Sequence, residues 1–245
     1  MYKVECRKLI ASPFFLLSVI ALYFVILLGI RDFYPENEIS SMLETGMGRI
    51  GLTSLPFLTT MPTAWFASEE TICTHYYQLI RSNLKSFING KLISSLLSSI
   101  LIVLSSTFIY TLTMILTGHP IGDGRFSYEG TNLLLLKHLV ENNHYWLHIL
   151  VFSVIATLSP WISLIASTFT KNRYIIFLAP FVVIRFLDVF GDLTGYFWIK
   201  PSHYRLSGTN IYELGMLGTF LYAFCFLAIC QLIYRYCIRR KLRNG

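Results

Sequence analysis

The sequence predicts an all-α integral membrane protein, a polytopic bundle of six transmembrane helices that forms one domain over residues 1–245. Hydrophobic residues make up 54% of the chain and charged residues only 13%, whereas soluble domains carry about 25% charged residues. The apolar residues also fall into segments close to the roughly 20 residues that a membrane-spanning helix needs. A soluble core of this length could not enclose so much apolar surface, which excludes a soluble globular protein.

Six apolar segments are long enough, or nearly so, to cross a bilayer. The second is the shortest and contains Pro56 and Pro62, while Pro160 and Pro180 lie in the fourth and fifth. Each proline removes a backbone donor and can bend its helix. An even number of crossings places both chain termini on one side of the membrane. The segments run from Pro13 to Ile30, Leu52 to Ala67, Leu92 to Thr117, Tyr145 to Thr170, Tyr174 to Phe190 and Leu214 to Tyr236.

Basic residues are concentrated on one side of this arrangement. With both termini inside, the inner segments are residues 1–12, 68–91, 171–173 and 235–245. They hold thirteen of the twenty basic residues and only three of the thirteen acidic ones. Cytoplasmic loops carry an excess of Lys and Arg, so we expect a multi-pass protein of the cell (plasma) membrane with cytoplasmic N- and C-termini. Because the charges are sorted by topology, nucleic acid is not an expected partner.

A polar stretch on this inner side, EETICTHYYQLIRSNLKSFINGKL, starts at Glu69 and separates the second and third apolar segments. Asn83 and the pair Asn89–Gly90 are candidate breaks within it. Its apolar residues recur at a spacing that gives a helix one apolar face. Such a helix either lies on the membrane surface or docks into a groove on a cytoplasmic protein. The recurring residues are Ile72, Tyr76, Leu79, Ile80, Leu84, Phe87 and Ile88.

This layout resembles the permease subunits of type-2 ABC exporters. In that family the second span leads into a cytoplasmic segment with an acidic residue, then a small residue and Thr. A short coupling helix follows, and then a Lys just before the third span. The N-terminal KVECRKLIASPFF also resembles the family's amphipathic helix, which lies along the inner leaflet before the first span. Cys73 stands where the family often has Gly. The matching positions are Glu69 or Glu70, Cys73, Thr74, residues 79–87 and Gly90–Lys91.

The resemblance implies a transmembrane permease that exports an amphipathic substrate, such as a peptide, drug or lipid-like molecule. A separate ATPase subunit would bind ATP and Mg, because this chain has no Walker-type phosphate loop. We therefore expect no catalytic residue and no cofactor here. The expected partners are ABC ATPase subunits, a second permease chain, identical or different, and the lipid bilayer. The implied ATPase contacts are Glu69, Glu70, Thr74, Tyr76, Tyr77, Arg81, Lys85, Phe87 and Lys91, with Tyr76, Tyr77 and Phe87 as buried aromatic anchors.

A group of histidines opens the fourth apolar segment on the outer side. His138, Glu141, His144 and His148 have side chains that ligate transition metals. Polar residues are expected at this boundary in any case, and there is no HExxH pattern. A metal-dependent membrane enzyme using His138, Glu141 and His148 is one alternative function. A non-transporting accessory or immunity protein that binds a partner in the bilayer is another.

Arg185 and Asp188 lie one helical turn apart near the outer end of the fifth segment. Spacing of three residues permits a local ion pair. Ionisable residues in a membrane region are also candidates for function, so these two could instead contact a polar part of the substrate or form part of an outer gate.

Overall fold

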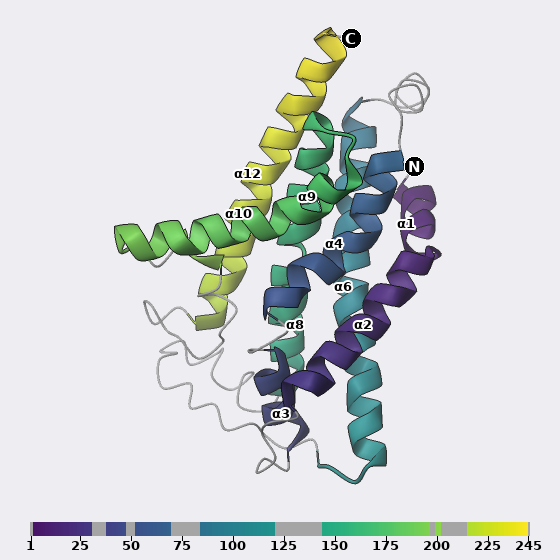
Figure 1. Ribbon diagram of the computed structural model, residues 1–245, viewed down its shortest axis with the longest axis vertical. Coiled ribbons are helices and arrows are strands. Elements are labelled where there is room, and N and C mark those ends of the chain that lie inside the picture. The colour runs from purple at the N-terminus through teal and green to yellow at the C-terminus, as the bar shows by residue number, and fades with distance from the viewer. Residues whose placement is uncertain are drawn as a thin grey trace.

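The computed structural model describes residues 2–30, 38–47, 52–69, 84–120, 144–196, 199–201 and 215–244, and this part of the chain is helical with no strands (Figure 1). Its helices are α1 (Tyr2–Ile10), α2 (Pro13–Ile30), α3 (Ile39–Gly46), α4 (Leu52–Glu69), α6 (Leu84–Leu116), α8 (His144–Ala156), α9 (Leu158–Phe169), α10 (Arg173–Thr194) and α12 (Gly215–Asn244).

Five helical segments among the described residues are long and apolar enough to cross a membrane: α2, α6, Ile149–Phe169, α10 and Gly218–Lys241. The multi-pass membrane character is thereby confirmed. The sixth expected span, Leu52 to Ala67, does form a helix, α4, but is not apolar enough to join this group. Two prolines and six Ser or Thr side chains in its 18 residues lower its hydropathy. The count of six spans is therefore not confirmed.

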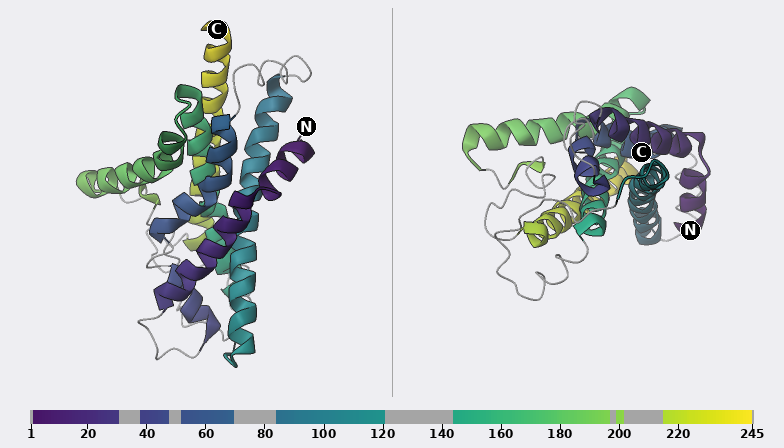
Figure 2. Two further views of the ribbon diagram at one scale, coloured as in Figure 1. Left: turned by 45° about the vertical axis from the view of Figure 1, so that its right-hand side comes forward. Right: turned by 90° about the horizontal axis from the view of Figure 1, so that it is seen from below.

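The helices form an elongated bundle with both chain termini towards the same end, here called the terminal end (Figure 1). Helices α2 and α6 run away from that end, whereas α4, the α8–α9 pair and α12 run back towards it (Figures 1 and 2). Helix α10 differs, because it leaves the bundle sideways in every view. Its N-terminal half packs against α4 and α9, while Phe186, Val189 and Leu193 farther along it are exposed.

The N-terminal helix is separated from the first span by a turn at Ala11–Ser12. The Ser12 hydroxyl oxygen accepts a hydrogen bond from the Phe15 amide at 3.1 Å and so caps α2. Pro13 then occupies the first helical position, where a missing amide hydrogen costs nothing. The short sequence Ser-Pro therefore ends one helix and begins the next.

Helix α6 is longer than the third apolar segment and begins at Leu84 instead of Leu92. The expected break at Asn89–Gly90 does not occur. Gly90 is buried, and α1 packs closely along this part of α6. A small residue lets two helices approach, and this contact offsets the low helix propensity of Asn and Gly.

The fourth apolar segment is divided into α8 and α9 at Thr157. Pro160 has no amide hydrogen to donate to the carbonyl of Ala156, four residues earlier. The Thr157 amide and hydroxyl both donate to the Val154 carbonyl, at 3.1 and 2.6 Å, just before the break. The helix is thus interrupted three residues before Pro160.

Pro180 is accommodated in α10 by a hydrogen bond from a neighbouring helix. The carbonyl of Ile176 would accept from residue 180 in a regular helix, but proline has no donor. The hydroxyl of Ser163, on α9, donates to that carbonyl at 3.1 Å. Ser163 and Ile176 are both fully buried, so the bond supplies a partner to a carbonyl that water does not reach.

Replacing Ser163 with alanine should lower the free energy of unfolding by about 1–2 kcal/mol, because the Ile176 carbonyl would be left buried without a donor. Equilibrium unfolding in mixed micelles of increasing SDS fraction measures this. Ser167→Ala is the matched control, since the Ser167 hydroxyl bonds only within its own helix, to Leu164. In a Pro180→Ala background the cost should shrink, because residue 180 regains its amide donor. An equal cost in both backgrounds would contradict the assignment.

Candidate functional site

The polar stretch that starts at Glu69 is predicted to dock on a partner or on the membrane surface. Residues 70–83 of this stretch, here called the docking segment, lie outside the described residues. Five of its implied contacts, Glu70, Thr74, Tyr76, Tyr77 and Arg81, fall there, as does Cys73. Glu69 is the last residue of α4, and its side chain is likewise not described. The other three implied contacts, Lys85, Phe87 and Lys91, lie on the first two turns of α6. The structure thus shows the two helices that the segment connects, α4 and α6, and how each is held.

Phe87 is part of the protein's own core and does not offer a surface to another protein. It is fully buried, with 0% exposure, in a cluster formed by α6, α9, α10 and α12. Its neighbours in this cluster include Leu92, Trp161 and Tyr234. The expectation that Phe87 anchors a partner is therefore corrected. The helical spacing identified an apolar face, but only the packing shows that this chain covers it.

Lys91 also points inwards, towards the N-terminal helix. Its ammonium lies 3.9 Å from a carboxylate oxygen of Glu5 on α1, and each of these residues is only 7% exposed. The same ammonium lies 5.3 Å from the centre of the Phe87 ring, one turn earlier on α6. Lys8 approaches Glu5 from the solvent side at 3.7 Å. Lys91, implied as an ATPase contact, thus joins α1 to α6.

Cys6 follows Glu5 on α1 and is half-buried. Burial, and secondly the neighbouring Glu5 charge, raise the pKa of the Cys6 thiol. The thiol is therefore mostly protonated at neutral pH. This residue provides a natural reporter of whether α1 stays docked on α6.

Two further contacts hold the start of α6. The Arg235 guanidinium, on α12, donates to the Asn89 side-chain carbonyl at 3.1 Å. The Trp161 indole, on α9, donates to the Leu92 carbonyl at 3.1 Å. Helix α6 is thus tied to α1, α9 and α12 within a few residues of the point where the docking segment joins it.

The end of α4 is held by an aromatic stack. The ring of Trp65 lies 4.1 Å from the ring of Phe14 on α2, measured between centroids. The guanidinium of Arg173, at the start of α10, lies 4.3 Å from the centroid of Trp65, within the range of a cation–π contact. One residue of α4 therefore contacts both α2 and α10, one turn before the docking segment begins.

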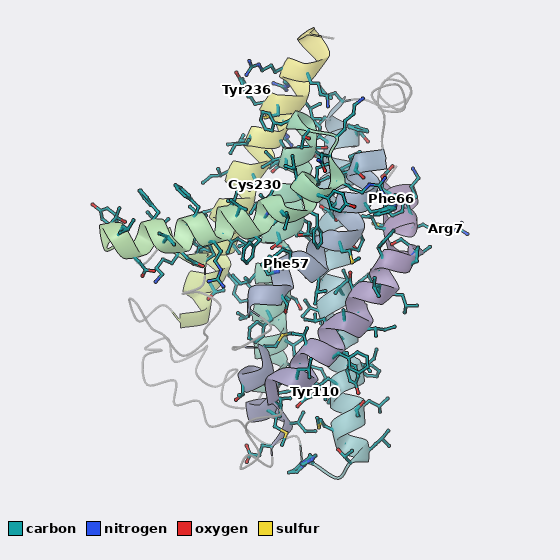
Figure 3. The ribbon with its side chains drawn as sticks, in the orientation of Figure 1. Arg7, Phe57, Phe66, Tyr110, Cys230 and Tyr236 are labelled. Carbon is teal, nitrogen blue, oxygen red and sulfur yellow. The ribbon has the colours of Figure 1, made fainter. Side chains whose placement is uncertain are left out.

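Helix α4 packs against other helices along most of its length. No described side chain from Ser54 to Ser68 is exposed, and the helix packs against α2, α6, α9 and α10. The Phe57 ring, for example, stacks on Phe181 of α10, with centroids 4.7 Å apart (Figure 3). The residues Pro56, Thr59, Thr60, Pro62 and Thr63 of α4 are buried against these helices. This burial lets α4 carry more polar residues than a helix that faces lipid could.

Buried hydroxyl groups surround this central helix. Most of those on α6 and α8 donate to a carbonyl of their own helix, as Ser94, Ser95 and Ser99 do. Among the residues described, four buried hydroxyls have no hydrogen-bond partner: those of Thr60, Thr63, Ser98 and Tyr110. Tyr110 lies three turns beyond Ser98 on α6, towards the end of the bundle away from the termini (Figure 3). The sequence shows many Ser and Thr residues in these helices but does not indicate which of them lack a partner.

The outer surface carries an apolar belt bounded by basic residues. On α12 the exposed residues change from Phe224 and Leu232 to Tyr236 and then to Arg239 and Arg240. Apolar, then aromatic, then basic is the order in which a helix crosses from lipid tails to headgroups. Arg7 on α1 projects outwards at the same terminal end (Figure 3), and Lys85 is exposed at the start of α6.

The predicted pair on the fifth segment is not the contact that Arg185 makes. Arg185 is exposed, and its guanidinium lies 5.6 Å from the ring centroid of Phe181, one turn towards the start of α10. Asp188 lies one turn in the other direction and is buried. The two residues therefore have different surroundings, and a role in the substrate path or an outer gate stays a prediction for each.

The histidine group is only partly described. His138 and Glu141 lie outside the described residues, and His144 and His148 belong to α8 with side chains that are not described. Within the described residues there is no group of three potential metal ligands.

Comparison with protein-family models, with curated proteins and with solved structures finds no match for this chain.

Proposed function

We propose that this protein is the membrane-spanning permease subunit of an ATP-driven ABC exporter, acting in the plasma membrane with both termini in the cytoplasm. A separate ATPase supplies ATP hydrolysis, with ATP and Mg bound on that partner. The observation that carries the proposal is the position of α4. It is the polar, proline-containing helix at the centre of an apolar bundle, and it leads directly into the amphipathic segment that resembles a coupling helix.

This arrangement provides a route from a cytoplasmic partner to the interior. A protein that binds residues 70–83 pulls on the end of α4 and on the start of α6. Trp65 passes the movement to α2 and α10, and Lys91 and Asn89 pass it to α1 and α12. A shift at one site becomes a rearrangement of packed helices because such interfaces have discrete alternatives. Glu69, Glu70, Thr74, Tyr76, Tyr77, Arg81 and Lys85 form the proposed ATPase contact.

A second permease chain is part of the proposal. Helix α10 projects from the bundle (Figure 1), with apolar residues such as Phe186 and Leu193 exposed beyond the reach of the other described helices. Pairing of two chains would cover this helix and enclose a path for an amphipathic cargo between them. Chemical cross-linking in membranes through Phe186→Cys tests the pairing directly.

Simultaneous charge reversal, Glu70→Lys with Arg81→Glu, should uncouple ATP hydrolysis from transport and leave the chain folded. Tyr76→Ala should weaken retention of the ATPase at least about tenfold, as expected for an aromatic residue that anchors an interface. The measurements are co-purification of the ATPase with tagged permease and ATPase activity with and without the permease in liposomes.

Arg240→Glu is the control, because it reverses an exposed charge at the same end of the molecule but outside the docking segment. It should leave co-purification and coupling unchanged. Coupling that persists in the Glu70 and Arg81 variant, with normal folding, would exclude residues 70–83 as the ATPase contact.

A further inference from the structure

The three unpartnered hydroxyls of the central helices, Thr60 and Thr63 on α4 and Ser98 on α6, are the most unusual polar groups in the interior. Each residue is at least nine-tenths buried, and none has a hydrogen-bond partner in the part of the chain that the structure describes. Buried polar groups in folded proteins are nearly always bonded to protein or to ordered water. We refer to these three side chains as the free-hydroxyl cluster.

The free hydroxyls are not explained by a general lack of acceptors on their helices. Thr59, beside Thr60, donates to the Leu55 carbonyl at 2.8 Å, and Ser99, beside Ser98, donates to Leu96 at 2.9 Å. Serine and threonine in helices commonly bond to a carbonyl three or four residues earlier. The three members of the cluster make no such bond, although their neighbours in the same helices do.

The helix register brings the cluster together. Ala67 packs against the core cluster that contains Ile88 and Leu92 of α6, and the two helices run in opposite directions (Figure 1). Farther back on α4, Leu55 belongs to the core cluster that contains Ile102 of α6. Thr60 and Thr63 on α4, and Ser98 on α6, lie between these two levels of contact, and Thr63 is one turn from Thr60 on the same face of α4.

The chemistry of the surroundings limits what these hydroxyls could bind. The sequence has no charged residue in α4 before Glu69 and none in α6 after Lys91. An ion without a compensating charge is strongly disfavoured in such an interior. A neutral group that both donates and accepts hydrogen bonds, such as water, a hydroxyl or an amide, satisfies the cluster without this cost.

We propose that Thr60, Thr63 and Ser98 form an internal site between α4 and α6 for neutral hydrogen-bonding groups, filled by water until a polar part of the cargo replaces it. The hydration of this site does not depend on the proposed function, whereas the replacement by cargo rests on it. The site deepens that proposal by locating a polar binding position inside a single permease chain.

The test is the reactivity of cysteines placed in the cluster. In a background with the five native cysteines replaced by alanine, Thr60→Cys, Thr63→Cys and Ser98→Cys are each treated with hydroxyethyl methanethiosulfonate, a small neutral hydrophilic reagent. The purified chain is used without any ATPase. The thiolate is the reacting form, and apolar burial suppresses it. A hydrated cluster should therefore react at least about tenfold faster than a dry buried position on the same helix.

Ser99→Cys is the matched control, because Ser99 is equally buried and adjacent but bonds within its own helix. Equal rates for Ser98→Cys and Ser99→Cys in folded protein would overturn the proposal. Hydroxyl-radical footprinting of the unaltered chain gives a second measurement that needs no substitution. Oxidation of Thr60 and Thr63 should exceed that of Ser106 and Thr107, which are equally buried but donate to carbonyls of their own helix, and the reverse order would also overturn it.

A further experiment tests whether the site binds a polar headgroup or only water. Pre-equilibration with octyl glucoside, a neutral amphiphile with a hydroxyl-rich headgroup, should slow labelling of Ser98→Cys if the site accepts a polar headgroup. Unchanged labelling would overturn the part of the proposal that concerns cargo and restrict the site to water. Since no ATPase is present, neither result depends on the docking segment. A negative result for the hydroxyl site can therefore be distinguished from a negative result for the exporter proposal.

Discussion

Replacing Lys91 with methionine should lower the free energy of unfolding by about 3 kcal/mol, because Glu5 would remain as a buried carboxylate without its inner partner. The two residues are 7% exposed each, and their charged atoms lie 3.9 Å apart. Lys8 still reaches Glu5 from the solvent side, which keeps the expected cost at the lower end of the range for a broken buried pair. Equilibrium unfolding in mixed micelles measures the effect.

A double-mutant cycle separates the ion pair from simple packing. Adding Glu5→Gln to Lys91→Met should recover part of the loss, because no uncompensated buried charge then remains. Lys8→Met serves as the control and should cost less than about 1 kcal/mol, as exposed pairs do. Labelling of Cys6 should accelerate in Lys91→Met if α1 leaves α6. A Lys91→Met variant as stable as Lys8→Met would show that the pair does not hold the two helices together.

Replacing Phe87 with alanine should destabilise the chain by about 3 kcal/mol, because it leaves a cavity in the core cluster at the base of α6. The loss should occur in the purified chain with no other protein present. This result would distinguish a core role from a role at a partner interface, where the substitution would leave the isolated chain unaffected.

Phe108→Ala is the matched control on the same helix. Phe108 is 65% exposed on the apolar outer surface, so its removal opens no internal cavity and should cost less than about 1 kcal/mol. Phe87→Leu, which retains most of the volume, should fall between the two. Equal stabilities for Phe87→Ala and Phe108→Ala would contradict the position of Phe87 in the core.

Several features of the fold could be read from local sequence. The helix starts at Pro13 and at Leu52, and the break near Pro160, follow from Ser-Pro, apolar runs and missing amide hydrogens. The basic residues that end the apolar belt were also visible as charge clusters. Each of these features depends only on residues within a few positions along the chain, so the sequence is sufficient to predict it.

The candidate site was predictable only in part. The apolar face of residues 84–91 was recognised from its spacing. The helices that cover it, α9 and α12, come from far along the chain. The sequence therefore could not distinguish a face that binds another protein from one that packs within this chain. Glu5 gave the only visible signal for the buried pair, as the one acidic residue before Ile30. The free hydroxyls of Thr60, Thr63 and Ser98 had no such signal, because every Ser and Thr carries the same groups and only geometry leaves some unbonded.

The sequence by itself determined that this is a multi-pass helical membrane protein, because hydropathy and charge are sums over residues and do not depend on how the helices pack. Only the tertiary structure decided which helix lies at the centre. A hydropathy value assumes that lipid surrounds each segment. Helix α4 packs against other helices and has no exposed side chain from Ser54 to Ser68, so it does not need to be as apolar as a helix that faces lipid. Its prolines and hydroxyls can therefore occupy the interior, where they are available for the transport role that we propose.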